Sequence, residues 1–242
     1  MVLSDFSRRG LCRSNIRNVR VPSQDQKGEF PAQDRGSRGI GNTHASLSSH
    51  GKIDIPERTD IVRRAGNHLT IYEFEGRIPS IAPTAYVDED ARVVGDVKIG
   101  AQCYIGAGAR LRGDYGSITI GDKTSVQENC VLHARISEKC EAGSHVQVGH
   151  GAILHNCTVK DYAVIGVGAI VSDYATVGIW SIVGEGAVVP SGTSIPDGKV
   201  AVGVPAKVVR ETSDSDKQVW TKYKDVYADL ALRYPKGLRR IR

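Results

Sequence analysis

The chain has 242 residues, enough for one large domain or two small ones, and only 6% of them are aromatic. Its five cysteines include no C-x-x-C pair, which argues against a disulfide framework or a cysteine zinc knuckle. The formal net charge of +5 lies in the two ends, because residues 71–212 are net acidic; we therefore expect solvated tails and no nucleic-acid partner.

Residues 1–52 are rich in Ser, Arg, Gly, Gln and Asn without periodicity, which predicts a disordered N-terminal segment. The Arg- and Ser-rich residues 1–24 faintly resemble a mitochondrial presequence, so the mitochondrial matrix is an alternative to the cytoplasm that we expect. No stretch is apolar enough to span a membrane, since even the uncharged run 142–159 contains three histidines. Order is expected to begin near Leu69, where residues 69–75 alternate like a strand.

From residue 81 onwards, aliphatic residues recur every six positions, a period that fits neither an α-helix nor a flat strand. The expected inward residues are Ile81, Val87, Val93, Ile99, Ile105, Leu111, Ile120, Val126, Leu132, Ala142, Val148, Leu154, Val159, Ile165, Val171, Val177, Val183, Val189 and Ile195.

Three hexads, or 18 residues, would make one triangular turn of a solenoid, each side being a short strand. The sequence thus predicts an all-β solenoid, a parallel β-helix of hexapeptide repeats, over residues 69–211 with about six coils. The small Cys103 and Cys130, each two places before an inward residue, are predicted to fill the core.

A C-terminal α-helix is predicted over residues 212–235, followed by a basic tail at 236–242. Ser213 and Asp216 have the spacing of a capping box. An apolar stripe recurs at helical spacing, which predicts that it lies along the solenoid and covers its last coil. Its members are Val219, Tyr223, Val226 and Leu230.

The repeat register aligns two histidines. His133 directly follows the inward Leu132, and His155 directly follows the inward Leu154, one coil plus a four-residue insertion later. Arg112 directly follows Leu111 and falls in the same column another coil away.

His150 lies two places after Val148, on the neighbouring side of the triangle. Three histidines would suit a catalytic zinc ion with one open position for water. If His150 cannot reach the other two within one chain, a neighbouring subunit of a symmetric trimer must supply it. The same column could alternatively be an acyltransferase site, with one imidazole as general base.

Four segments resemble motifs of the γ-class carbonic anhydrases, a family of the hexapeptide-repeat superfamily. They are residues 111–114 (LRGD), 126–133 (VQENCVLH), 148–155 (VGHGAILH) and 203–211 (GVPAKVVRE). Together with the C-terminal helix and its Trp220 and Tyr227, they most resemble the phenylacetate-degradation branch of bacterial members. The resemblance implies a left-handed β-helix and a homotrimer, with His133 and His155 binding metal from one subunit and His150 from the next.

The resemblance also implies roles for the neighbouring polar residues. Arg112 and Asp114 would form an ion pair beside the site, and Gln127 would orient bound water or bicarbonate. The family archetype has a long acidic loop with a proton-shuttle glutamate, whereas residues 134–141 are short and offer Glu138 as the candidate.

The function expected from the resemblance is a carbonic anhydrase, a lyase that interconverts CO2 and bicarbonate. Zinc would lower the pKa of bound water to about 7, so that hydroxide attacks CO2, and Fe2+ or Co2+ would fit the same ligands. The alternatives are an acyl-CoA thioesterase or acyltransferase of the same superfamily, and a non-catalytic assembly subunit.

Overall fold

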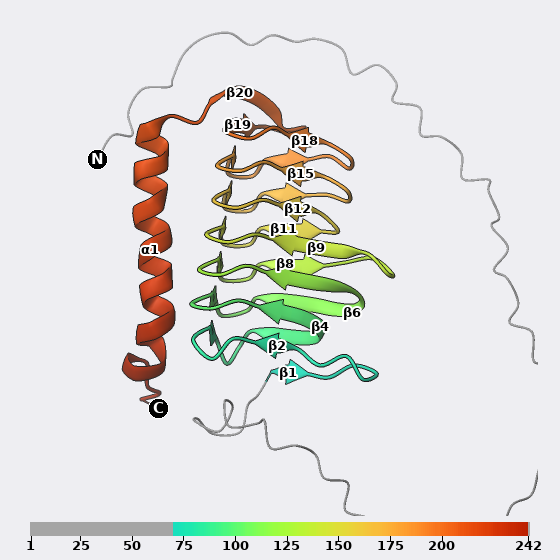
Figure 1. The fold of residues 1–242 in the computed structure, drawn as a ribbon, viewed down its shortest axis with the longest axis vertical. Helices are drawn as coiled ribbons and strands as arrows, with labels where there is room; N and C mark the ends of the chain where they lie inside the picture. Colours follow the sequence, from blue (N-terminus) through green and yellow to red (C-terminus); the bar gives the residue numbers. More distant parts are fainter. Residues whose placement is uncertain (1–69, 242) are drawn as a thin grey trace, which may run out of the picture. The chain divides into compact units, whose positions relative to one another are not determined.

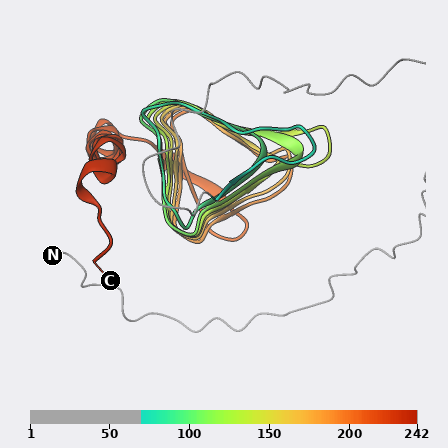
Figure 2. The same ribbon diagram turned by 90° about the horizontal axis from the view of Figure 1, so that it is seen from below.

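The computed structural model describes residues 70–241, so the predicted disordered segment 1–52 lies outside the described residues. Residues 70–211 coil into a parallel β-solenoid of triangular cross-section, and a single α-helix follows (Figures 1 and 2). This confirms the predicted left-handed β-helix of hexapeptide repeats with a C-terminal helix.

One side of the triangle is an eight-stranded sheet. Seven of its strands are parallel, so the solenoid makes about seven turns and not the six that the repeat count predicted. Its strands are β3 (Tyr86–Val87), β5 (Tyr104–Ile105), β7 (Ser125–Val126), β10 (Gln147–Val148), β13 (Val164–Ile165), β16 (Ile182–Val183), β19 (Lys199–Val202) and the antiparallel β20 (Lys207–Glu211).

The other two sides belong to a twelve-stranded sheet, because its two longest strands bend around the corner between them. The strands are β1 (Ile71–Tyr72), β2 (Ser80–Ile81), β4 (Arg92–Ile99), β6 (Arg110–Ile120), β8 (Val131–His133), β9 (Lys139–Ala142), β11 (Ile153–His155), β12 (Thr158–Val159), β14 (Ile170–Val171), β15 (Thr176–Val177), β17 (Val188–Val189) and β18 (Ser194–Ile195). The strand predicted at residues 69–75 is shorter than expected, since only β1 forms there.

The core is a stack of the predicted inward residues. All of them are buried except Ile81 and Val87, which are partly buried and pack against the stack in the first coil. Cys103 and Cys130 are fully buried, as predicted. Each coil thus buries its aliphatics on the coils above and below, and the sum of many such contacts stabilises the domain.

Glycine allows the sharp corner shared by β4 and β6. A Cβ atom on Gly113 would lie 2.4 Å from the backbone oxygen of Asp96 in the coil below, closer than any side chain tolerates. Asp114 is the next residue, and the pairing of β4 with β6 shifts register just beyond this close approach.

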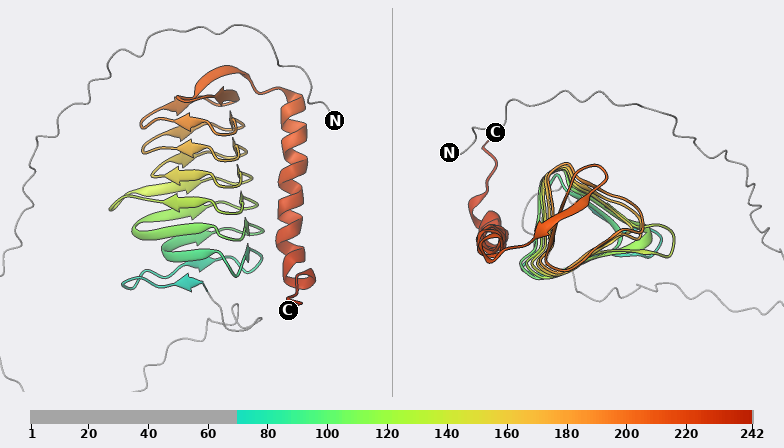
Figure 3. Two further views of the ribbon diagram at one scale, coloured as in Figure 1. Left: turned by 180° about the vertical axis from the view of Figure 1, so that it is seen from behind. Right: turned by 90° about the horizontal axis from the view of Figure 1, so that it is seen from above.

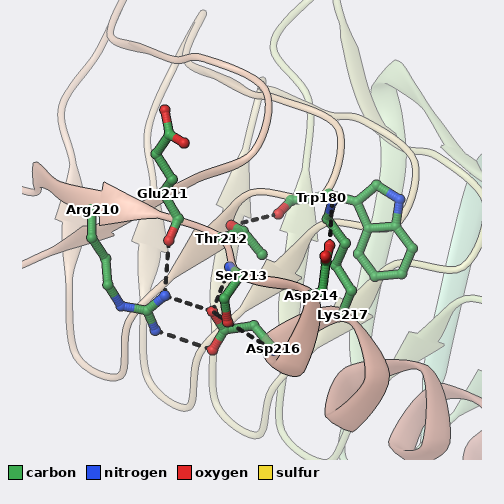
Figure 4. A network of polar contacts seen from close by, with 8 residues as sticks. All are labelled: Trp180, Arg210, Glu211, Thr212, Ser213, Asp214, Asp216 and Lys217. Carbon is green, nitrogen blue, oxygen red and sulfur yellow. Dashed lines mark hydrogen bonds and ion pairs between the residues drawn. The ribbon is translucent and has the colours of Figure 1, made fainter.

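The helix α1 (Asp214–Gly237) begins with the predicted capping box. The Ser213 hydroxyl accepts a hydrogen bond from the Asp216 backbone N–H at 3.1 Å, and the Asp216 carboxylate accepts one from the Ser213 backbone N–H at 2.8 Å. Arg210 adds an ion pair with Asp216 (Figure 4), and the Thr212 hydroxyl donates to the Trp180 backbone oxygen at 2.9 Å.

The position of α1 corrects two expectations. The last coil is covered by β20, which pairs antiparallel with β19, while α1 runs back along the eight-stranded sheet towards the first coils (Figures 1 and 3). The stripe of Val219, Tyr223 and Val226 is exposed, and the packed side of the helix is offset by one position. Its members are Trp220, Lys224, Tyr227, Ala228, Ala231 and Tyr234.

A buried lysine is one reason why the predicted and the packed sides of α1 differ by one position. Lys224 is only 3% exposed, its ammonium group donates to the Tyr162 backbone oxygen at 2.5 Å, and it lies 4.6 Å from the centre of the Trp180 ring. A cation–π contact and a hydrogen bond make burial of a lysine tolerable, whereas a hydrophobicity pattern places lysine outside. Among the described residues, no helix is long and apolar enough to cross a membrane.

Candidate active site at the histidine column

The strand pairing confirms the predicted alignment of Arg112, His133 and His155. Arg112 on β6 pairs with His133 on β8, which pairs with His155 on β11. Each residue directly follows a fully buried leucine, so each side chain points outward from the same side of the triangle.

The rings of His133 and His155 each point one nitrogen towards the other ring. His133 Nδ1 and His155 Nε2 are 3.1 Å apart, and the ring planes make an angle of 43°. At this distance either one nitrogen donates a proton to the other, or both lone pairs are available to one shared cation.

A carboxylate behind His155 fixes which nitrogen carries its proton. Asp173 Oδ1 lies 2.7 Å from His155 Nδ1, so His155 donates there and leaves Nε2 with its lone pair. Arg135 donates two hydrogen bonds of 2.8 Å to the Asp173 carboxylate. The Arg135 guanidinium and the His155 ring hold the pKa of Asp173 far below its usual value, so the carboxylate stays ionised at neutral pH.

A second carboxylate lies behind His133. Asp114 Oδ1 is 3.4 Å from His133 Nε2, and Asp114 also accepts a hydrogen bond of 2.8 Å from Arg112. Burial, and then the charge of Arg112, lower the pKa of His133, which favours the neutral ring. Its Nε2 is buried without a hydrogen-bond partner among the described residues.

The third predicted ligand, His150, does not join this pair within one chain. It follows β10 on the eight-stranded sheet, and its side chain is 49% exposed. Its Nδ1 contacts Glu128 Oε2 at 2.6 Å. Over residues 70–241, no three His, Cys, Asp or Glu side chains of a single chain gather where they could hold a metal ion.

The other two predicted site residues are less closely connected. Gln127 is 2% exposed, and its amide nitrogen has no hydrogen-bond partner among the described residues. Glu138 lines a shallow polar cavity of about 300 Å³ with Glu141, Asn156 and Tyr174. None of the three histidines borders this cavity, and Glu138 is connected to the pair only indirectly, through its backbone N–H bond to Arg135.

The residues present fit part of a metal centre. Two nitrogens that bind one tetrahedral zinc ion at about 2.0–2.1 Å lie about 3.3 Å apart, close to the separation of His133 and His155. Both rings are backed by carboxylates, the usual arrangement behind metal-binding histidines. The pair therefore fits two positions of a site for a divalent metal, and residues 70–241 of the same chain bring no third ligand to it.

Four residues near these histidines were not predicted: Arg135 and Asp173, which support His155, and Glu128 and Tyr104, whose hydroxyl donates a hydrogen bond of 2.8 Å to Glu128 Oε1. A signal existed for Glu128, which is 22 residues before His150, the same spacing as between His133 and His155. The pairing of β14 with β11 places Ser172 one coil beyond His155 and Asp173 directly after it, although the hexad between Leu154 and Val159 is one residue short and obscures the count.

The fold and the outward histidine column define a protein of hexapeptide repeats. The carnitine operon protein CaiE of Proteus is 38% identical over 170 residues, which cover 70% of this chain and 86% of the Proteus protein. CaiE of Salmonella newport is also 38% identical, over 173 residues, with 70% of this chain and 86% of that protein covered. The chain therefore belongs to the hexapeptide-repeat superfamily, in the family of CaiE.

Two solved structures share the fold over most of the described chain. A Bacillus cereus protein provisionally named as an acetyltransferase is 33% identical with a TM-score of 0.68, covering 69% of this chain and 98% of its own. A hexapeptide transferase family protein of Anaplasma phagocytophilum is 33% identical with a TM-score of 0.65, covering 68% and 97%. No protein-family model matches the chain.

Proposed function

We propose that the chain is a metal-dependent enzyme that interconverts CO2 and bicarbonate, with His133 and His155 of one subunit and His150 of another binding the metal in a homotrimer. The observation that carries this proposal is the pair of imidazole nitrogens 3.1 Å apart, each ring having a carboxylate behind it. One neutral ring would suffice for proton transfer, whereas two convergent rings are what a shared cation requires.

The chain's own residues would bind and orient. Asp173, held by Arg135, keeps the proton of His155 on Nδ1 and directs the Nε2 lone pair towards His133. The lowered pKa of His133 keeps its ring free of the extra proton that would exclude a metal. A divalent metal bound there would act as a Lewis acid that ionises water near neutral pH.

Two polar residues would complete the site in this proposal. The unpaired amide nitrogen of the buried Gln127 is available to donate a hydrogen bond to an oxygen of bicarbonate or water. The ion pair of Arg112 and Asp114 places a half-exposed guanidinium at the end of the column, where it would attract the bicarbonate anion.

A second candidate is acyl transfer from, or hydrolysis of, an acyl-CoA thioester. The names of the two solved relatives favour it over CO2 hydration, and the name CaiE states an operon and no reaction. In the structure, the Asp173–His155 pair has the form of an oriented general base, with Nε2 as the proton acceptor. His133 would then have to turn away to admit substrate, because its Nδ1 occupies that acceptor now.

Metal removal separates the two candidates. The protein would be purified anaerobically, its metal content measured, and CO2 hydration and acetyl-CoA cleavage assayed before and after chelation and after reloading with Zn2+, Fe2+ or Co2+. We expect hydration to disappear with the metal and to return on reloading. Hydration absent from fully loaded protein, together with thioester cleavage that persists after chelation, would favour acyl transfer instead.

A further inference from the structure

We infer that Glu128 and Tyr104 are positioning residues for His150, and that they connect this histidine to the C-terminal helix. They would hold the ring so that Nδ1 faces its own subunit and Nε2 faces outward. The inference rests on the proposed function in one respect, namely that the outward Nε2 serves the histidine pair of a second subunit.

Glu128 lies directly beneath His150 in the solenoid. The pairing of Val126 with Val148 places the two residues at the same position of successive coils. Glu128 Oε2 lies 2.6 Å from His150 Nδ1, at ion-pair distance, and this buried oxygen has no hydrogen-bond partner among the described residues, so a small turn of the His150 ring would let Nδ1–H donate to it. The His150 ring therefore has a carboxylate beside it, as His155 has Asp173, although His155 lies in β11 and His150 in the turn after β10.

The other oxygen of the Glu128 carboxylate accepts a hydrogen bond from the preceding coil. The Tyr104 hydroxyl donates a hydrogen bond of 2.8 Å to Glu128 Oε1. With one oxygen bonded to Tyr104 and the other against His150, the carboxylate cannot rotate without losing a contact. Gly106 leaves the space for it, because a Cβ atom there would lie 2.9 Å from Glu128 Oε1.

Tyr104 is in turn fixed by the helix. It is 3% exposed, and its ring lies against Tyr227 and Tyr234 of α1 with ring centres 5.3 and 5.5 Å away. The Tyr86 ring of the coil below also stacks on it, with ring centres 5.6 Å apart. The helix thus fixes the hydroxyl that donates to Glu128, and Glu128 in turn contacts the half-exposed His150.

The chemical result is control of the His150 tautomer. A neutral imidazole whose Nδ1–H is donated to a carboxylate has its lone pair on Nε2, the form able to bind a metal. Without Glu128 both tautomers would be populated, and the ring would be free to turn.

The test reads the tautomer directly, in metal-free protein with 15N-labelled histidine. Long-range 1H–15N NMR spectra of the wild type, Glu128→Ala, Glu128→Gln and Tyr104→Phe would be compared, with His150 assigned from His150→Gln. We expect an excess of the Nδ1–H form in the wild type, a fall of about tenfold in the tautomer ratio for Glu128→Ala, and a smaller fall for Tyr104→Phe. Glu128→Gln keeps an acceptor oxygen and should restore most of the wild-type ratio.

Tyr86→Phe is the matched control, since its hydroxyl belongs to the same tyrosine cluster but donates to Asp88. It should leave the ratio unchanged. In the same proteins, zinc affinity should fall about 10–100-fold for Glu128→Ala and stay unchanged for Tyr86→Phe. An unaltered His150 tautomer in folded Glu128→Ala would overturn the inference. If the tautomer shifts as expected but the wild type binds no metal, the positioning role stands and the proposed function fails.

Discussion

The coils that carry His133 and His155 and the coils that follow them, here called the plain coils, have the same kind of core but different outer surfaces. Leu132 and Leu154 in the former, and Val171 and Val189 in the latter, occupy the same stacked position and are all fully buried. One place further along each strand, where the side chain points outward, the column changes. It reads Arg112, His133 and His155 and then continues as Ser172 and Pro190.

The histidine coils also contain the irregularities of the repeat. Leu132 and Ala142 are ten residues apart where a hexad would give six, and β4 and β6 bend around a corner that later strands do not cross. The plain coils show that the solenoid needs neither the insertion nor the histidines for its packing. Inward residues therefore determine the fold, and outward residues and insertions are free to determine chemistry.

The comparison predicts that substitutions at equivalent outward positions have unequal effects on function. His155→Ala should lower metal affinity and activity by more than the roughly 100-fold that loss of a ligand's supporting partner costs. Ser172→Ala, one coil later, should leave both unchanged. Thermal unfolding would show that both variants stay folded, since both side chains lie outside the core. Equal losses of metal affinity in the two variants would contradict the assignment of function to the histidine coils.

A smaller effect is expected at the carboxylate behind His155. Asp173→Asn keeps an acceptor for His155 but removes the charge that Arg135 holds, so metal affinity should fall by about 10–100-fold. Asp161→Asn is the matched control, because this aspartate accepts a hydrogen bond from the Ser144 backbone N–H and touches no histidine of the column. Isothermal titration with Zn2+ would measure both, and an unchanged affinity in Asp173→Asn would show that the carboxylate does not support the pair.

The sequence predicted the core and the histidine column because both follow from one number, the period of six. Once Leu132 and Leu154 point inward, the residues after them must point outward and lie one above the other. The capping box of Ser213 and Asp216 was predictable for a similar reason, since the three-residue spacing is local.

The remaining features depend on contacts that periodicity does not encode. The prediction of which side of α1 packs on the solenoid was wrong by one position. Two apolar stripes overlap on this helix, and the charged Lys224 interrupts the stripe that is buried. The supporting contacts of Asp173 with His155 and of Tyr104 with Glu128 cross between coils through side-chain rotamers. Their distances follow from packing and could not be read from the repeat.

The smallest expected effect concerns Lys224, where α1 packs on the eight-stranded sheet, and it affects stability alone. Burial lowers the pKa of Lys224 from its usual 10.5 to about 8, so between these values the unfolded chain binds a proton that the folded chain does not. Stability should therefore rise with pH, and relative to Lys224→Met the wild type should gain about 2 kcal/mol between pH 7 and pH 10. Urea unfolding at several pH values would measure this gain. Parallel pH profiles for the two proteins would contradict it.

The most direct test of the shared site is complementation between two inactive variants. His155→Ala retains His150, and His150→Ala retains the pair of His133 and His155. Unfolded and refolded together, they should form mixed trimers in which one interface of three has a complete set of ligands, so that metal binding and activity return in part. Mixing His155→Ala with His133→Ala is the control and should restore nothing, because both changes affect the same column. Recovery with the first mixture alone is the result we predict, and verified mixed trimers that recover no metal would contradict a site shared between subunits.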